Sequence, residues 1–287
     1  MKKSLLLILI LVIFQIILLL HCSTLKELAS IQKPTVTLDH VQVTGLTFDD
    51  ISLKFDIAID NPNQLSVNLA GFDYDFLLND QSFIQGQQSD ELSIQAQSRS
   101  IVELPVDLVF KDIYKSYQNL KNLDSTDYQL KVGLLFDLPV LGQTKIPVSM
   151  KGRFPLIKIP TLAIESLHLT NLNLFSANLQ LNIRLDNPNS MSLLLNKINY
   201  KFKVNGIEWI SGLNENPQMI EQNAKSILEI PIRLNFMQIG QTAYNLVSGT
   251  SSVNYNLDGF LNFGSSGGLI QNQNVTFNQS GTMPIQR

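Results

Sequence analysis

Cysteine is almost absent from this chain of 287 residues, whose only thiol is Cys22. An intrachain disulfide is therefore excluded, whatever the redox state of the compartment. Histidine is also scarce, and neither His40 nor His168 has Cys or His neighbours at the spacing of a metal site. Charged residues make up only 16% of the chain and hydrophobic residues 44%. This balance excludes a disordered polyelectrolyte and leaves enough apolar side chains for a packed core.

Excess positive charge is absent as well. The formal net charge is −3, so a surface built to attract nucleic acid is excluded. The chain has no Gly-x-Ser-x-Gly elbow, phosphate loop or dinucleotide fingerprint. The Gly-Ser-Ser-Gly-Gly run at 264–268 is expected to be a flexible loop, because no helix-forming run follows it. We therefore expect no catalytic residues, no cofactor and no metal.

What the N-terminus does have is an export signal. Lys2 and Lys3 precede an apolar run over 5–20, which Gln15 alone interrupts. A basic segment followed by an apolar one predicts a signal peptide, here residues 1–21. Cys22 stands directly after the run, and the segment 19–22 (Leu-Leu-His-Cys) is similar to a bacterial lipobox. His21 departs from the small residue usual before the cleavage point, so we expect slow or partial processing.

Cys22 is accordingly the expected lipidation site, and residues 22–30 the expected tether between lipid and folded domain. The alternative is an uncleaved anchor helix, although the run is slightly short for a span of about 20 residues. Either arrangement tethers the protein to a membrane and exports everything after Cys22. The expected location is the bacterial cell envelope, at the outer membrane or its periplasmic face, with the cell surface as an alternative.

The remainder of the chain contains two copies of one domain in tandem. A shift of 126 residues aligns 44–120 with 170–246 without a gap, and 25 of those 77 positions are identical. Unrelated sequences match far less often, so the shift indicates a tandem duplication. The similar closing segments 152–156 and 281–285 place the predicted domains at 31–156 and 157–287.

Each copy contains runs in which apolar and polar residues alternate. A strand sends successive side chains to opposite faces, so these runs predict half-buried strands. Six or seven such strands separated by turn signals favour a sandwich of two sheets. The runs cover 51–59, 72–78, 102–110 and 128–136 in the first copy and 179–185, 198–204, 228–236 and 255–263 in the second.

Two features interrupt the strand pattern. Pro105 and Pro231 lie inside strand-like runs, and proline cannot donate to a ladder, so we expect these strands at a sheet edge or at a bulge. Residues 111–122 lack Gly and Pro and place Ile113, Tyr117 and Leu120 at helical spacing. They predict one short helix per copy, although Gly240 interrupts the second.

The most conspicuous polar motif is an Asp-Asn-Pro-Asn tetrad in each copy. Asn and Asp side chains cap turns through their own backbone and Pro presets φ, so the tetrads are expected to be structural turns. Calcium ligation by the two Asp residues is the alternative, but the motif lacks the dense carboxylates of such a site. The tetrads consist of Asp60, Asn61, Pro62 and Asn63 in the first copy and Asp186, Asn187, Pro188 and Asn189 in the second.

Glu103 and Glu229 occupy matched positions, but no second matched carboxylate or His accompanies them. We therefore expect solvated residues and not general acids.

The two copies differ in charge. Residues 31–156 hold 10 basic and 16 acidic residues, a net of −6, and residues 157–287 hold 8 basic and 7 acidic residues, a net of +1. This difference predicts either an acidic, solvated first domain or a second domain specialised for binding a partner.

Together these features resemble the late embryogenesis abundant type 2 family, also called the WHy domain. The resemblance rests on the strand that ends in Asn-Pro-Asn at 61–63 and 187–189, on the aromatic-rich strand that follows, and on the strands 100–105 and 226–231 before a helix. It covers almost all of 31–287, and only 264–273 departs from it. It implies an all-β fold: two tandem immunoglobulin- or fibronectin-III-like sandwiches, each with one short helix, after the signal peptide.

The resemblance also implies a function in tolerance of desiccation and other stresses, without enzymatic activity. Bacterial members are often exported or lipid-anchored. We therefore expect a membrane-anchored stress-protection or interaction module whose partner is the membrane, through the lipid on Cys22. The alternatives are an envelope protein that binds lipid or another apolar ligand between its sheets, and a surface protein that contacts a host. For the former, the simpler expectation is that apolar side chains fill the cores.

Overall fold

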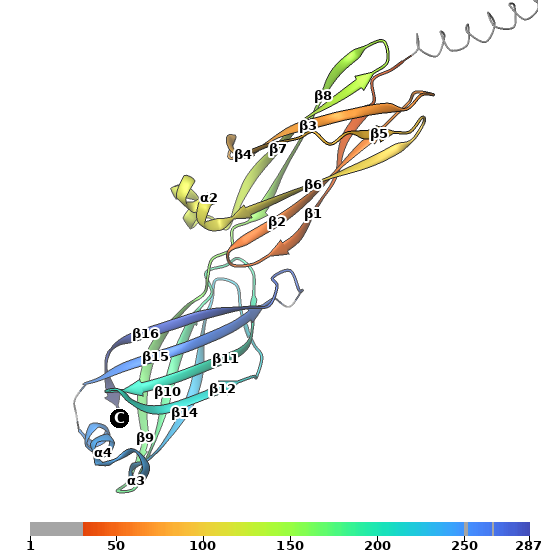
Figure 1. The fold of residues 1–287 in the computed structure, drawn as a ribbon. Coiled ribbons are helices and arrows are strands. Elements are labelled where there is room, and N and C mark those ends of the chain that lie inside the picture. Colours follow the sequence, from red (N-terminus) through yellow and green to blue (C-terminus); the bar gives the residue numbers. More distant parts are fainter. Residues whose placement is uncertain (1–30, 250–251, 266) are drawn as a thin grey trace, which may run out of the picture. The chain divides into compact units, whose positions relative to one another are not determined.

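A computed structural model describes residues 31–249, 252–265 and 267–287. The predicted signal peptide, Cys22 and the predicted tether lie outside the described residues. Contacts divide the chain into two compact units that interleave along the sequence. The second unit contains Leu156–Arg287 and also two segments from earlier in the chain, Gly45–Ile51 and Leu108–Asp124. Each copy of the repeat is built from strands and a few short helices (Figure 1). The predicted all-β class is confirmed.

The first copy forms two sheets. One has the strand order β1-β2-β6, and the other has the order β4-β3-β7-β8 with the short β5 paired to β3. The pairs β3–β4, β3–β7 and β7–β8 are all antiparallel, as in a sandwich of hairpin-connected strands. The strands are β1 (Thr35–Leu46), β2 (Asp50–Asp60), β3 (Val67–Leu78), β4 (Gln81–Gln88), β5 (Leu92–Ile94), β6 (Arg99–Val109), β7 (Ser125–Leu138) and β8 (Gly142–Pro155).

The second copy repeats this order but joins its two sheets. The last strand pairs in parallel with the first at Ile285–Leu167 and Gln286–His168, which gives one eight-stranded sheet with the order β12-β11-β15-β16-β9-β10-β14 and β13 paired to β11. The strands are β9 (Thr161–Leu172), β10 (Ser176–Asp186), β11 (Leu193–Val204), β12 (Ile207–Asn214), β13 (Gln218–Ile220), β14 (Lys225–Asn235), β15 (Ser252–Gly264) and β16 (Gln273–Gln286).

The alternation of the sequence places the core. In β2 every second side chain, including Phe55, is buried, and the same holds for β10. Aromatic rings meet between the sheets of the first copy: the centroid of the Tyr128 ring lies 5.7 Å from that of Phe55 and 5.3 Å from that of Phe76. Burial raises the pKa of the Tyr128 hydroxyl. These inward positions are occupied by the protein's own side chains.

Four tyrosine rings lie over four glycines on neighbouring strands. Tyr74 pairs with Gly86 across β3 and β4, and Tyr200 pairs with Gly212 at the matched positions of the second copy. A Cβ atom at Gly86 would lie 2.5 Å from the Tyr74 ring, so only glycine leaves room for it. An aromatic ring over a cross-strand glycine covers backbone that would otherwise be exposed. The other two pairs are Tyr128 with Gly152 and Tyr255 with Gly281.

The expected edge strands are confirmed, since β6 with Pro105 and β14 with Pro231 each stand at the end of a sheet.

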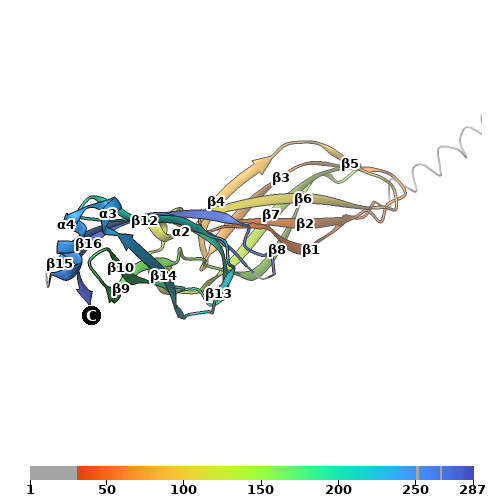
Figure 2. The same cartoon turned by 90° about the horizontal axis from the view of Figure 1, so that it is seen from below.

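The expected single helix per copy is divided in two. The first divides into α2 (Phe110–Ser116) and the 3-10 helix η1 (Gln118–Asn122), because the backbone of Tyr117 leaves the helical region, with φ −130° and ψ 82°. The second divides into α3 (Phe236–Ile239) and α4 (Gln241–Ser248), because Gly240 has a φ of +94°. Figure 2 shows α3 and α4 together at one end of their sandwich.

Candidate functional site

The Asn-Pro-Asn motif of the first copy forms a buried clamp on the backbone. The side-chain nitrogen of Asn61 donates to the carbonyl oxygens of Leu65 at 2.9 Å, Ile94 at 3.3 Å and Gln95 at 2.9 Å. Its side-chain oxygen accepts from the backbone nitrogen of Asn63 at 3.1 Å. One buried amide thereby fixes the turn after β2 and also the loop after β5.

Asn63 extends the clamp to the start of the domain. Its side-chain nitrogen donates to the Asn61 oxygen and to the carbonyl oxygen of Gln32, both at 2.9 Å, and its oxygen accepts from the Gln32 nitrogen at 2.7 Å. Both Asn side chains are buried. Because each amide is engaged with main-chain groups, the pair holds segments together that are more than thirty residues apart.

The second copy reproduces the clamp atom for atom. Asn187 donates to the carbonyl oxygens of Met191 at 2.9 Å, Ile220 at 3.3 Å and Glu221 at 3.0 Å. Asn189 takes both bonds to the backbone of Lys158, at 2.8 and 2.9 Å. Every partner is shifted by the 126 residues of the repeat, so the duplication preserves a hydrogen-bond network as well as a sequence.

The other residues of the tetrads lie outside the clamp. Asp60 is 3.6 Å from the guanidinium of Arg99, and Asp186 accepts a hydrogen bond of 3.1 Å from Arg184. Pro62 is exposed and Pro188 is half-buried. Each Asp therefore faces an arginine, which competes with a cation for the carboxylate. Within the described ranges no group of three or more His, Cys, Asp or Glu could hold a metal ion.

The matched glutamates and the histidines are on the surface of the sheets or near it. Glu103 accepts a hydrogen bond of 2.8 Å from Lys54, and this bond raises the pKa of the lysine. Glu229 is exposed in β14, opposite Asn182 of β10. His40 is exposed in β1, and His168 is half-buried in β9, where it pairs with Gln180. The structure does not bring these four residues together into one site.

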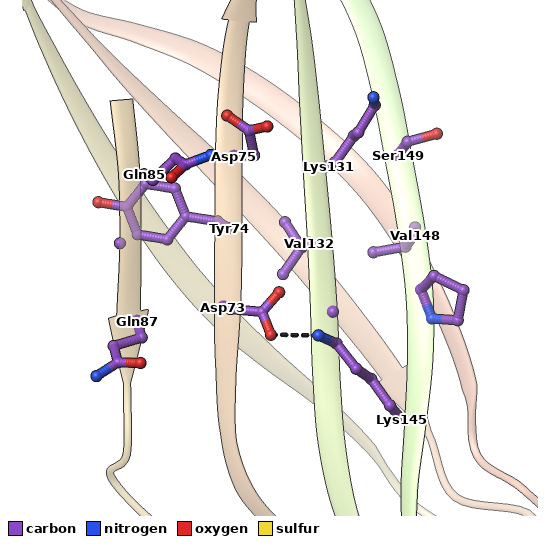
Figure 3. A pocket seen from close by; sticks show the side chains of 13 residues that line it. Asp73, Tyr74, Asp75, Gln85, Gln87, Lys131, Val132, Lys145, Val148 and Ser149 are labelled. Atoms are coloured by element: carbon purple, nitrogen blue, oxygen red, sulfur yellow. Dashed lines mark hydrogen bonds and ion pairs between the residues drawn. The ribbon is translucent and has the colours of Figure 1, made fainter. Parts of the chain in front are cut away.

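An open groove lies on the outer face of the sheet β4-β3-β7-β8 (Figure 3). This groove was not predicted from the sequence. Asp73 and Asp75 project from β3, Lys131 from β7 and Lys145 from β8. Gly133 lies between Asp73 and Pro147, and because it has no side chain of its own, that of Lys145 fills the space above it. The groove therefore presents both signs of charge, with the Lys145 side chain lying over the backbone of Gly133.

The charges of the groove are partly paired. Lys145 reaches across Gly133 to form an ion pair with Asp73, and Ser82 donates to Asp75 at 2.6 Å. The matched positions of the second copy carry Asn199 instead of Asp73 and Phe260 instead of Gly133, so the groove is not repeated. An alignment of the polar positions of the predicted strands could have indicated the groove, because the polar residues of alternating strands share one face of the sheet.

No helix within the described residues is long and apolar enough to cross a membrane. The anchor predicted at Cys22 and the apolar run before it lie outside that part of the chain, so Cys22 stays a prediction.

Comparison with known proteins supports the reading of the repeat. A family model described as late embryogenesis abundant protein matches residues 56–152 and 182–281, once in each copy and over more than half of the chain. A desiccation-related protein of Arabidopsis thaliana is 28% identical over 137 residues, which is 48% of this chain and 81% of that protein. Lea14-A, a late embryogenesis abundant protein of Gossypium hirsutum, is 26% identical over 137 residues, which is 48% of this chain and 89% of that protein.

Among solved structures, the solution structure of a putative late embryogenesis abundant protein is 28% identical, has a TM-score of 0.37, and covers 45% of this chain and 74% of its own. The sequence of each of these relatives thus corresponds to about half of this chain. The family model, in contrast, matches both halves in turn. The chain therefore belongs to the late embryogenesis abundant type 2 family and carries the family's domain twice.

Proposed function

We propose that this protein protects the bacterial cell envelope during loss of water, as a membrane-tethered lipoprotein that acts without catalysis. The observation that carries the proposal is the match of the family model to both copies. It is supported by the names of two relatives, which are described as desiccation-related and late embryogenesis abundant. Within the family we place the chain with the WHy-type members.

The polar chemistry of the domains supports a binding or stabilising role. The four buried amides of the clamps are engaged with backbone groups, and Asp60 and Asp186 face arginines. The groove of the first copy carries charges of both signs, a composition suited to hydroxylated or zwitterionic solutes and to membrane headgroups. Because these buried amides bond the protein's own backbone, they need no water molecule to satisfy them.

The tether is part of the proposal. Lipid on Cys22 would hold both domains at one membrane of the envelope, on the exported side, where drying and osmotic shock act first. Lipid chains supply about 0.8 kcal/mol per buried methylene, and two or more chains together give stable anchoring. The membrane is therefore the partner we assign through Cys22.

The test is survival of a deletion strain under drying, freezing and osmotic shock. We expect lower survival than wild type under at least one of these, restored by the wild-type gene and not by a Cys22→Ser gene. Protease treatment of intact cells identifies the side of the envelope on which the domains lie. A deletion strain that survived every stress as well as wild type would count decisively against the proposal.

A further inference from the structure

The loop between β1 and β2 packs against the hairpin between β15 and β16. Residues Gly45–Ile51 belong to the second compact unit, where the Phe48 ring stands edge-on to the Phe263 ring with the centroids 5.8 Å apart. The backbone nitrogen of Gln271 donates to the carbonyl oxygen of Leu46 at 3.1 Å. Phe48 is only 5% exposed, and Ile270 in the β15–β16 hairpin is 2% exposed. The β1–β2 loop thus buries Phe48 on the β15–β16 hairpin.

The second copy has the same loop, between β9 and β10, but the apolar side chains of this loop are exposed. Leu174 occupies the position of Phe48 and is 74% exposed, and the adjacent Phe175 is 67% exposed. Met237, which is 82% exposed, adjoins them because the Phe236 nitrogen donates to the Phe175 carbonyl oxygen at 2.9 Å. We call Leu174, Phe175 and Met237 the apolar tip.

The apolar tip is held in place by its neighbours. The side-chain oxygen of Asn173 accepts from the backbone nitrogens of Phe175 and Ser176, both at 2.9 Å, and that of Asn235 accepts from Met237 at 3.0 Å. The sequence contains no Asp or Glu over 166–185 or 230–257. The matched loop of the first copy carries Asp49 where the tip carries Phe175. The three side chains of the tip are uncharged and fixed in place, and the charged residues within those two ranges are Arg184 and Arg233. Large exposed apolar groups of this kind mark interaction sites.

The first copy, in turn, exposes the matching hairpin. The β7–β8 turn corresponds to the β15–β16 hairpin, because Phe136 of β7 occupies the position of Phe263 of β15. Here Val140 is 76% exposed and Leu141 is 48% exposed, and no charged residue lies between Asp137 and Lys145 in the sequence. Val140 also has a φ of +71°, which β-branched residues seldom adopt. The loop and the hairpin that meet at Phe48 therefore each have a counterpart in this chain that exposes apolar side chains. The β7–β8 turn, between Leu138 and Gly142, is shorter than the connection between Gly264 and Gln273.

We propose that copies of this protein associate head to tail, with the apolar tip of one chain packed on the β7–β8 turn of the next. The contact would repeat the packing of Phe48 on the β15–β16 hairpin, with Leu174 in the place of Phe48. Because the two surfaces differ, the interface is heterologous and can continue from one copy to the next. The occupant is thus a second copy of this chain, because a hairpin of this chain receives such a loop at Phe48.

The experiment uses the full chain in the membranes of its own host, with benzoylphenylalanine in place of Leu174. Illumination is expected to give a dimer-sized product whose cross-linked peptide contains Val140 and Leu141. Addition of Val140→Asp should lower the yield about tenfold, since a charge at the centre of an apolar contact removes most of its affinity. Benzoylphenylalanine in place of Ile227, an exposed apolar residue of β14, is the matched control and should give no dimer.

Three results would overturn the proposal. Cross-links from position 174 to lipid would make the tip a membrane-inserting element, and cross-links to a different protein would assign it another partner. Cross-links from 174 to 174 would show a symmetric contact in place of the head-to-tail one. Circular dichroism of each purified variant checks that the substitutions, which all lie on the surface, leave the strands intact.

Discussion

The side-chain oxygen of Asn61 accepts two hydrogen bonds from Asn63, one from its backbone nitrogen at 3.1 Å and one from its side-chain nitrogen at 2.9 Å. Asn187 and Asn189 repeat both bonds at 3.0 and 2.9 Å. This relationship makes two short side chains into one rigid unit. Through it the end of β2, the loop after β5 and the start of the domain are held together in each copy.

Removal of one clamp should destabilise its domain. In Asn187→Ala the carbonyl oxygens of Met191, Ile220 and Glu221 lose their donor, and Asn189 loses its acceptor. Unpaired polar groups of this kind cost about 2–4 kcal/mol of folding free energy in total. Urea unfolding measures the loss. Asn178→Ala, at an exposed position of β10, is the control and should change stability by less than about 0.5 kcal/mol.

The glycines beneath the tyrosine rings should not tolerate a side chain. A Cβ atom at Gly152 would lie 2.5 Å from the Tyr128 hydroxyl oxygen, and that ring is packed against Phe55 and Phe76. Because the ring has little room to move, Gly152→Ala should cost about 1–3 kcal/mol. Thermal unfolding and the near-ultraviolet circular dichroism of the tyrosines measure it. Gly267→Ala, where a Cβ atom would meet nothing within 4 Å, should be neutral, and equal losses in both variants would contradict this account.

The strands could be predicted from the sequence because alternation is a local signal, and the duplication could be found by aligning the sequence with itself. Pro105 and Pro231 predicted strands at a sheet edge or at a bulge, since proline lacks a donor for the ladder, and both strands stand at the end of a sheet. The partners of the Asn side chains could not be read in this way. Whether Asn63 reaches Gln32 depends on how distant segments meet, which no local pattern records. The division of the helix at Tyr117 and the parallel pairing of Ile285 with Leu167 escaped prediction for the same reason.

The groove and the apolar tip were missed for a different reason. Periodicity identifies which side chains face the core, and it treats the outer positions as solvated. Asp73 and Lys145 lie on different strands, and only the register of the sheet shows that they form an ion pair. Leu174 and Phe175 are apolar, so composition alone would have placed them in the core, yet the structure exposes them.

Acid should weaken the first domain partly through Asp127. Arg153 forms a two-pronged hydrogen bond with it, at 2.7 and 3.1 Å, and this bond lowers the pKa of the carboxyl group. A carboxyl group whose pKa is lower in the folded state adds stability above its unfolded pKa, near 3.8, and loses it as the pH falls through the folded pKa. Unfolding from pH 2 to 6 should therefore show a smaller acid-induced loss for Asp127→Asn than for wild type. Since the pair is exposed, high salt should reduce the difference.

The final prediction concerns Cys22, the only thiol of the chain. A single cysteine directly after an apolar run cannot pair within the chain, so a disulfide gives no reason for its position. Lipidation does, because a thiol there can carry the acyl chains that hold the exported domains at the membrane. We expect a fatty-acid analogue to label the wild type, and Cys22→Ser to remain an unlabelled, uncleaved precursor. His21→Ala places a small residue before the cleavage point and should speed maturation while leaving the label in place. Equal label in wild type and Cys22→Ser, or none in either, would show that Cys22 carries no lipid and that residues 5–20 are an ordinary anchor.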